Sequence, residues 1–263
     1  MKQDKLSHAA GLVVEARLAR RPLAQLPASC RVDDLEDAYE TQDRANSILE
    51  ARLGRRVGFK IGGTTESMRR YLKAPEPMGG EVFASTVHES GARLGFEDYL
   101  RPGIETEIAV RLARPLPARP APYGREEVGE AIGTVMAAIE LVDDRYEDFA
   151  AIGAPTLIAD NVFNAACILG EELADWRHLL LDQLQARTFI GGAQVAQGMS
   201  DALLGHPLDA LAWLANRRAA QHRGLDAGAF VSLGSITPVQ WLAAPGTARI
   251  EVDGLGTVEL TLV

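Results

Sequence analysis

Three glutamates are the residues whose type and spacing most clearly suggest chemistry. Glu140 is the one charge in the apolar run VMAAIELV, and Glu105 and Glu107 stand two residues apart in RPGIETEIAV. In a strand, this spacing places both carboxylates on one face and the apolar residues on the other. Three carboxylates without a nitrogen or sulfur ligand suit Mg²⁺ or Mn²⁺ and suit Zn²⁺ poorly. The residue types alone leave two alternatives open: a solvated strand face for Glu105 and Glu107, and a salt bridge for Glu140.

Lys60 lies between Phe59 and Ile61 in GFKIGG, a short strand-like segment that ends in two glycines. Its side chain is expected to point away from the face of its apolar neighbours, and the glycines let another group approach the backbone closely. A lysine placed in this way can bind a substrate carboxylate or stabilise an enolate; a lysine that reaches solvent is the alternative. The glycine spacing matches neither a P-loop nor a dinucleotide fingerprint, which argues against a nucleotide cofactor.

Hydroxyl groups and an Asp-Asn pair are further candidates. SLGSITP carries Ser235 and Thr237, whose hydroxyls can contact a carboxylate or keto oxygen, although an ordinary turn uses the same residue types. Asp160 and Asn161 in LIADNVFN either order the site or cap a turn. The five histidines show no paired metal-ligand spacing. No Gly-x-Ser-x-Gly motif occurs, so serine-hydrolase chemistry is not predicted.

Composition places the chain among ordinary globular proteins, with 263 residues, 47% hydrophobic and 24% charged. The net charge of -9 and the scattered basic residues argue against nucleic-acid binding, because phosphate contacts require clustered lysine and arginine. Cys30 and Cys167 have no CxxC spacing and are expected to be reduced thiols. No run approaches the ~18 apolar residues of a membrane span, and charges interrupt the apolar patch near the N-terminus. We therefore expect a cytoplasmic protein that does not contact membranes.

The order of the predicted elements indicates an α+β fold. Helical periodicity covers about 4–20 and 33–53, where Asp33 or Asp34 can cap the second helix and Gly54 can end it. Strand signals dominate from Gly79 onward, and helices interrupt them at about 125–136 and 207–222. The predicted strands are 81–85, 104–112, 138–143, 164–170, 182–190, 193–199, 229–234, 247–252 and 257–263. We predict an N-terminal α/β unit over residues 1–78 and a β-rich catalytic domain over residues 79–263.

Six separated motifs together resemble the 2-keto-4-pentenoate hydratase and 4-oxalocrotonate decarboxylase group of the fumarylacetoacetate hydrolase superfamily. In chain order they are GFKIGGT, IETEIAV, AAIELVDDRY, LIADN, LGHPLDALAWLAN and LGSITP. The resemblance implies a mixed β-sandwich or roll with a smaller N-terminal helical unit, and Mg²⁺ or Mn²⁺ held by Glu105, Glu107 and Glu140. It also implies that Lys60 lies beside a bound 2-oxo acid, whose enolate a divalent ion would stabilise.

The chain departs from the family pattern in the segment EPMGGEVF. Family hydratases carry an aspartate in a Pro-Asp-aromatic-Gly segment, and here Met78 and Gly79 stand in place of the aspartate and the aromatic residue. The decarboxylases also lack this aspartate but keep the aromatic residue. If hydration needs a proton-transfer group at this place, Glu81 and His88 are the nearby candidates.

The resemblance predicts a divalent-metal-dependent lyase of aromatic catabolism that hydrates a 2-hydroxy-2,4-dienoate (2-oxo-4-enoate) to a 4-hydroxy-2-oxo acid. In this scheme Lys60 is catalytic and contacts the substrate together with Ser235 and Thr237. Three alternatives stay open: a 4-oxalocrotonate-type decarboxylase, an acylpyruvate-type hydrolase, and a non-catalytic partner subunit of such an enzyme. We expect a homo-oligomer whose binding partner is a small 2-oxo or 2-hydroxy-dienoic acid.

Overall fold

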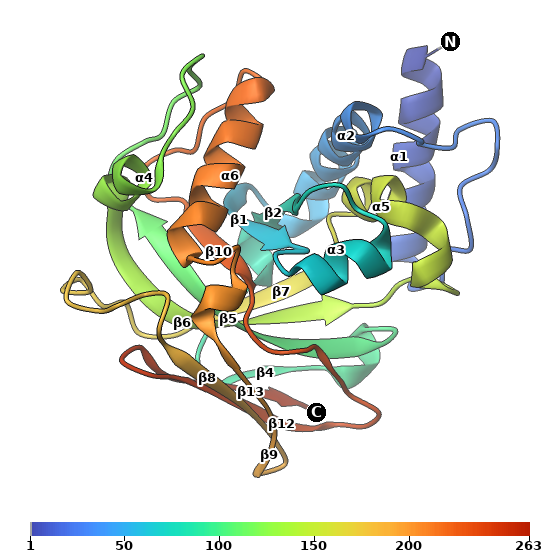
Figure 1. Ribbon diagram of the computed structural model, residues 1–263. Helices are drawn as coiled ribbons and strands as arrows, with labels where there is room; N and C mark the ends of the chain where they lie inside the picture. Colours follow the sequence, from blue (N-terminus) through green and yellow to red (C-terminus); the bar gives the residue numbers. More distant parts are fainter. Residues whose placement is uncertain (1) are drawn as a thin grey trace.

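Two β-sheets packed face to face form the body of the protein, and helices pack around the larger sheet (Figure 1). The computed structural model describes residues 2–263. The larger sheet has eight strands, in the order β2 (Met78–Phe83), β1 (Arg56–Gly62), β10 (Phe230–Ser235), β5 (Pro102–Leu112), β6 (Ile132–Asp143), β7 (Asn164–Leu169) and β3 (Val87–Glu89), with β11 (Gln240–Trp241) beside β5. The smaller sheet has five strands, in the order β4 (Ala92–Leu94), β13 (Gly256–Leu262), β12 (Gly246–Val252), β8 (Gln185–Ile190) and β9 (Ala193–Met199).

The helices form two sets in Figure 1: α1, α2, α3 and α5 lie on the side of the N-terminus, and α4 and α6 lie on the other side. Within residues 2–263 they are α1 (Lys2–Leu18), α2 (Leu35–Leu53), α3 (Glu66–Leu72), α4 (Arg125–Ala131), α5 (Phe149–Ala159) and α6 (Pro207–Ala220), with three short 3₁₀ turns at Ala84–Thr86, Phe96–Asp98 and Ser200–Ala202. As predicted, Asp34 caps α2 by accepting the Asp37 N–H, and Gly54 ends it with a φ of 77°. None of these helices is both long and apolar enough to cross a membrane.

The two faces of the larger sheet differ in chemistry, and β5 and β6 at its centre show the difference most clearly. Ile104 and Ile108 are fully buried and belong to the main hydrophobic core, which lies between the two sheets and also includes residues of α4 and α6. Glu105, Glu107 and Glu140 lie on the opposite face, because side chains alternate along each strand. The alternation predicted for IETEIAV is therefore confirmed, and it places the three carboxylates on the face turned away from this core.

The predicted α+β class and the N-terminal helices are confirmed, and the differences concern the limits of some elements and the omission of α5, β3, β4 and β11. The helix predicted over 125–136 ends at Ala131, and the strand predicted over 138–143 begins at Ile132, because β6 pairs with β5 along its whole length. α5 is absent from the sequence prediction because Gly153, with a φ of 76°, and Pro155 interrupt its helical pattern. The domain boundary after residue 78 stays a prediction; Met78 opens β2, which pairs with β1 in the larger sheet.

Candidate metal and substrate site

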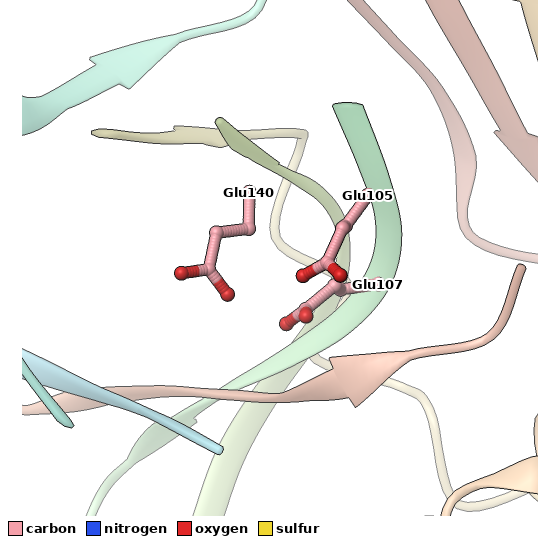
Figure 2. A group of neighbouring side chains, drawn as sticks. All are labelled: Glu105, Glu107 and Glu140. Carbon is pink, nitrogen blue, oxygen red and sulfur yellow. The ribbon is translucent and has the colours of Figure 1, made fainter. Parts of the chain in front are cut away.

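Glu105, Glu107 and Glu140 form one compact cluster (Figure 2). Glu105 lies directly opposite Glu140 in the antiparallel pairing of β5 and β6, and Glu107 follows two residues later on the same face. One oxygen from each carboxylate lies within 4.8 Å of the others. Glu107 and Glu140 are completely buried, so a solvated strand face does not describe this segment. The strand pairing thus brings together the three residues predicted as metal ligands.

The contacts of the cluster leave part of its charge uncompensated. Lys60 Nζ lies 3.2 Å from Glu140 Oε1, which also accepts a hydrogen bond of 3.0 Å from Asn164. Glu107 Oε2 accepts hydrogen bonds from the Ser232 hydroxyl and from the backbone of β10. Glu140 Oε2 and Glu107 Oε1 are buried without a hydrogen-bond partner among the described residues. The salt bridge considered for Glu140 therefore exists, but one ammonium cannot balance three carboxylates.

The electrostatics of the cluster indicate what it lacks. Burial, assisted by the charge of Glu140, raises the pKa of Glu105 to about 7 and raises the pKa of Glu107 well above its ordinary value. A divalent cation would offset both effects by supplying the missing positive charge. The donor set consists of oxygen atoms alone, and two of these oxygens have no other partner. These residues fit a hard cation such as Mg²⁺ or Mn²⁺.

Lys60 is buried beside the cluster and does not reach solvent, since only 2% of its side chain is exposed. Its Nζ donates a hydrogen bond of 3.0 Å to the Val162 carbonyl in addition to its contact with Glu140. Burial on its own would lower the pKa of Lys60, but the negative charges of the three glutamates outweigh it and raise the pKa. Lys60 is therefore a protonated, fixed positive charge.

The turn that holds Lys60 is conformationally unusual. Asn161, Val162 and Phe163 have φ values of 63°, 52° and 63°, and a β-branched residue such as Val162 rarely adopts this left-handed region. The Asn161 side chain fixes the turn against β2, because its Oδ1 accepts the Glu81 N–H at 2.8 Å and its Nδ2 donates to the Glu81 carbonyl. Of the two roles considered for Asn161, the structure shows that it orders the turn beside Lys60.

Two cavities meet at Glu105. The larger, of about 390 Å³, is bordered by Ser235, Thr237 and three other hydroxyl residues of the segment after β1. Ser235 Oγ donates to the Thr237 carbonyl at 2.7 Å, and the Thr237 hydroxyl lies 3.1 Å from that of Thr188. The smaller, of about 70 Å³, is bordered by Lys60 and mainly by apolar side chains. Ser235 and Thr237 therefore lie near the cluster, with hydroxyls that already have internal partners.

Met78 borders the smaller cavity. Glu81 and His88, the two candidates for the missing proton-transfer group, point elsewhere. Glu81 lies an odd number of residues from Met78 on β2 and so faces the other side of the sheet, where Arg56 and Arg218 bind it. His88 pairs with Ile168, on the face opposite the carboxylates. Neither Glu81 nor His88 borders either cavity, so neither occupies the place of the family aspartate in this geometry.

Two contacts of the cluster are absent from the sequence prediction. Asn164 and Ser232 each place a polar side chain against one of the buried carboxylates. The signal for Ser232 is a hydroxyl inside the apolar strand FVSLGS, since a buried hydroxyl needs a partner. Asn164 follows the Asp-Asn pair closely and offers no signal of its own.

Comparisons with known proteins agree with this geometry. The family described as fumarylacetoacetate (FAA) hydrolase C-terminal matches residues 65–263. The chain is 31% identical to a 2-keto-4-pentenoate hydratase of Burkholderia vietnamiensis, over 98% of this chain and 97% of that protein. It is 29% identical to a 2-hydroxyhexa-2,4-dienoate hydratase of Comamonas testosteroni, over 94% and 93%. A solved 4-oxalocrotonate decarboxylase from Pseudomonas putida G7, complexed with magnesium and adipate, superposes with a TM-score of 0.93 at 26% identity, covering 100% of this chain and 99% of that one.

Proposed function

Because the chain belongs to the fumarylacetoacetate hydrolase family and has its fold, we propose that it is a divalent-metal-dependent hydratase. It adds water to a 2-hydroxy-2,4-dienoate, through the 2-oxo tautomer, and forms a 4-hydroxy-2-oxo acid in the breakdown of aromatic compounds. The observation that carries this proposal is the cluster of three carboxylates, two of them fully buried, beside one buried lysine. Similarity to named hydratases over nearly the whole chain supports it.

Glu105, Glu107 and Glu140 are the proposed ligands of Mg²⁺ or Mn²⁺. When bound, the ion would polarise the 2-oxo group and stabilise negative charge on its oxygen. Asn164 and Ser232 orient Glu140 and Glu107 through their hydrogen bonds, which keep the two carboxylates from rotating away from the cluster.

Lys60 is the proposed catalytic residue and a substrate contact. Its ammonium is fixed by Val162 and Glu140, so its positive charge is already in place before the substrate arrives. Such a charge favours an enolate over the neutral ketone, because it need not reorganise during the reaction. In its protonated state Lys60 can donate a hydrogen bond or a proton to the substrate.

Ser235 and Thr237 border the larger cavity, which we propose as the place of the substrate head and of the water that adds to it. The Ser235 hydroxyl already donates a hydrogen bond to the Thr237 carbonyl, so its oxygen can only accept a further hydrogen bond. This arrangement suits a donor such as water better than it suits a carboxylate. The proposed role of Ser235 is therefore to position water.

Decarboxylation of a 4-oxalocrotonate-type substrate is the second candidate function. It is favoured by the solved decarboxylase with a TM-score of 0.93, and by Met78, which stands where the sequence pattern of the hydratases has an aspartate. Both reactions pass through an enolate, so the same carboxylates and the same lysine would serve either one. The residues around the substrate, and not those of the cluster, must separate the two activities.

Product analysis tests the proposal. Purified protein loaded with Mg²⁺ is incubated with 2-hydroxypenta-2,4-dienoate and, separately, with 2-oxo-3-hexenedioate, and ultraviolet absorbance and product mass are followed. We expect a water adduct of the dienoate. Loss of CO₂ from the second compound without hydration of the first would assign a decarboxylase, and inertness toward both would favour a hydrolase or a non-catalytic partner subunit.

We also propose a cytoplasmic protein that assembles as a homo-oligomer. The buried, unpaired thiols of Cys30 and Cys167 are compatible with a reducing compartment. Light scattering on the purified chain would measure its state of assembly.

A further inference from the structure

The smaller cavity beside Glu105 has a wall of apolar and aromatic side chains. Those that shape it include Met68, Leu72, Met78, Phe149, Phe163 and Trp241. The rings form a connected set: Phe149 lies 5.5 Å from Phe163 and 6.4 Å from Trp241 between ring centroids. Aromatic rings in such contact form a stable apolar wall, because their mutual packing adds to the free energy of their burial.

The smaller cavity has one positive charge on its border, and that charge already has internal partners. Lys60 and Glu105 are the charged residues that border it, within the part of the chain that the structure describes. Lys60 already contacts Glu140 and the Val162 carbonyl. A distal carboxylate that entered would lose its water and would compete with the substrate head, Glu140 and the Val162 carbonyl for Lys60. It would also face the negative charge of the cluster.

The two cavities divide the surroundings of the cluster into chemically different halves. The larger cavity carries the hydroxyls of Ser235 and Thr237, and the smaller is almost entirely apolar apart from Lys60 and Glu105. Glu105 borders both. A ligand bound at the cluster can therefore place a polar head in one half and an apolar end in the other.

We infer that the smaller cavity selects 2-oxo acids whose distal end is uncharged and apolar, and that it rejects dicarboxylic acids. Met78 and Met68 contribute to this selection as parts of the apolar wall. This rests on the proposed function, because it takes the carboxylate cluster to bind the 2-oxo acid head. Met78 would then contribute to substrate selection at the place where the hydratase pattern has an aspartate.

Equilibrium binding tests the inference without turnover. Isothermal titration of the Mg²⁺-loaded protein compares stable ligands of equal chain length: 2-oxopentanoate with 2-oxoglutarate, and 2-oxohexanoate with 2-oxoadipate. We expect each monocarboxylate to bind at least about tenfold more tightly than its dicarboxylate partner, since an unpaired buried charge is strongly rejected. A preference below tenfold in both pairs, or no binding of any 2-oxo acid, would overturn the inference.

A substitution tests whether charge at the site sets the preference. Met68 is partly exposed on α3 and borders both cavities, so Met68→Arg can supply a guanidinium beside the ligand, and it should reduce the preference by about tenfold. Met199→Arg on the edge strand β9 adds the same charge at an exposed position outside the cavity, and it should leave the preference unchanged. Equal effects of the two arginines would overturn the inference, because only net charge would then matter.

Met78 is tested by a pair of substitutions of similar size. Met78→Leu keeps the wall apolar and should leave the affinity for 2-oxohexanoate within about threefold. Met78→Gln places an amide in the same wall and should weaken that affinity by about tenfold, because the amide lacks a partner there. Equal affinities in the two variants would remove Met78 from the selection.

The binding tests and the product analysis can fail separately. A protein that shows the predicted preference and yet leaves the dienoate unchanged would contradict the proposed hydratase activity while the inference stands. A protein that hydrates the dienoate and binds dicarboxylates as tightly as monocarboxylates would keep its proposed function and lose the inference.

Discussion

Buried glutamates occur in two regions of the larger sheet, one around Glu81 and one at the cluster of Glu105, Glu107 and Glu140, and the two regions differ in how their charge is balanced. Glu81 on β2 accepts hydrogen bonds of 2.8 Å from Arg56 and from Arg218, one on each oxygen, and another from Asn46. Glu107 and Glu140 lie on β5 and β6, Lys60 contacts Glu140, and each of the two glutamates keeps an oxygen without a partner among the described residues. Both oxygens of Glu81 therefore have positively charged partners, whereas the cluster has more negative charge than its one lysine can balance.

The difference teaches that burial of a carboxylate does not by itself mark a functional site. The network around Glu81 extends to Asp43, whose hydrogen bonds with Arg223 and Arg56 hold the pKa of its carboxyl well below the usual range. In the cluster, by contrast, burial raises the pKa of Glu105 to about 7. A surplus of like charge in a buried position is costly, and it indicates a group that the protein binds.

Metal removal should produce the largest effect, because it returns the cluster to its unbalanced state. EDTA should reduce hydratase activity by about 10³-fold or more, since a bound divalent ion contributes several kcal/mol of stabilisation to the reacting oxygen. Mg²⁺ or Mn²⁺ should restore the activity. Thermal unfolding of the EDTA-treated protein serves as the control for loss of fold, and full activity of the rigorously metal-free protein would contradict the account.

Lys60→Ala should have the next largest effect. Loss of a fixed positive charge beside the developing enolate should lower turnover by about 10²-fold or more. Affinity for oxalate, an enolate mimic, should fall while affinity for the metal changes little. Steady-state kinetics and titration with oxalate measure the two quantities, and wild-type values for both would remove Lys60 from the site.

Paired glutamine substitutions separate the two groups by stability. Glu81→Gln should lower the free energy of unfolding by about 1–3 kcal/mol, because it leaves two partly buried arginines short of a counter-charge. Glu140→Gln should preserve or raise the stability of the metal-free protein, since it removes surplus negative charge. Urea denaturation in EDTA provides both values. A larger loss for Glu140→Gln than for Glu81→Gln would reverse the comparison.

Ser232→Ala should have the smallest effect. The hydroxyl orients Glu107, and loss of such an outer contact should weaken metal affinity by about tenfold. Ser47→Ala, at an exposed hydroxyl on α2 that donates to the Asp43 carbonyl, is the matched control and should leave metal affinity unchanged. Equal affinities in the two variants would show that Ser232 does not support the cluster.

Local sequence patterns predict those parts of the site that depend on a single strand. Side chains alternate between the two faces of a strand. This period places Glu105 and Glu107 on one face, and it places Lys60 on the face opposite its apolar neighbours Phe59 and Ile61. The position of Glu140 opposite Glu105 depends on the register of β5 with β6, which is a long-range pairing that no local pattern specifies.

Other parts of the site arise from interactions that override local preference. The left-handed turn at Val162 exists because Asn161 binds the backbone of β2, a strand far away in the sequence. The Val162 carbonyl in this turn accepts a hydrogen bond from Lys60. The kinked helix α5 around Pro155 likewise has no helical pattern that could predict it. Tertiary packing, and not propensity, determines these features.

Direct titration with Mn²⁺, followed by electron paramagnetic resonance, tests most directly the claim that the unbalanced cluster holds a divalent ion. The account predicts one bound Mn²⁺ per wild-type chain and competition by Mg²⁺. It further predicts an affinity at least about 10²-fold weaker in Glu140→Gln and an unchanged affinity in Glu81→Gln. Binding of Mn²⁺ by Glu140→Gln with wild-type affinity would contradict the claim.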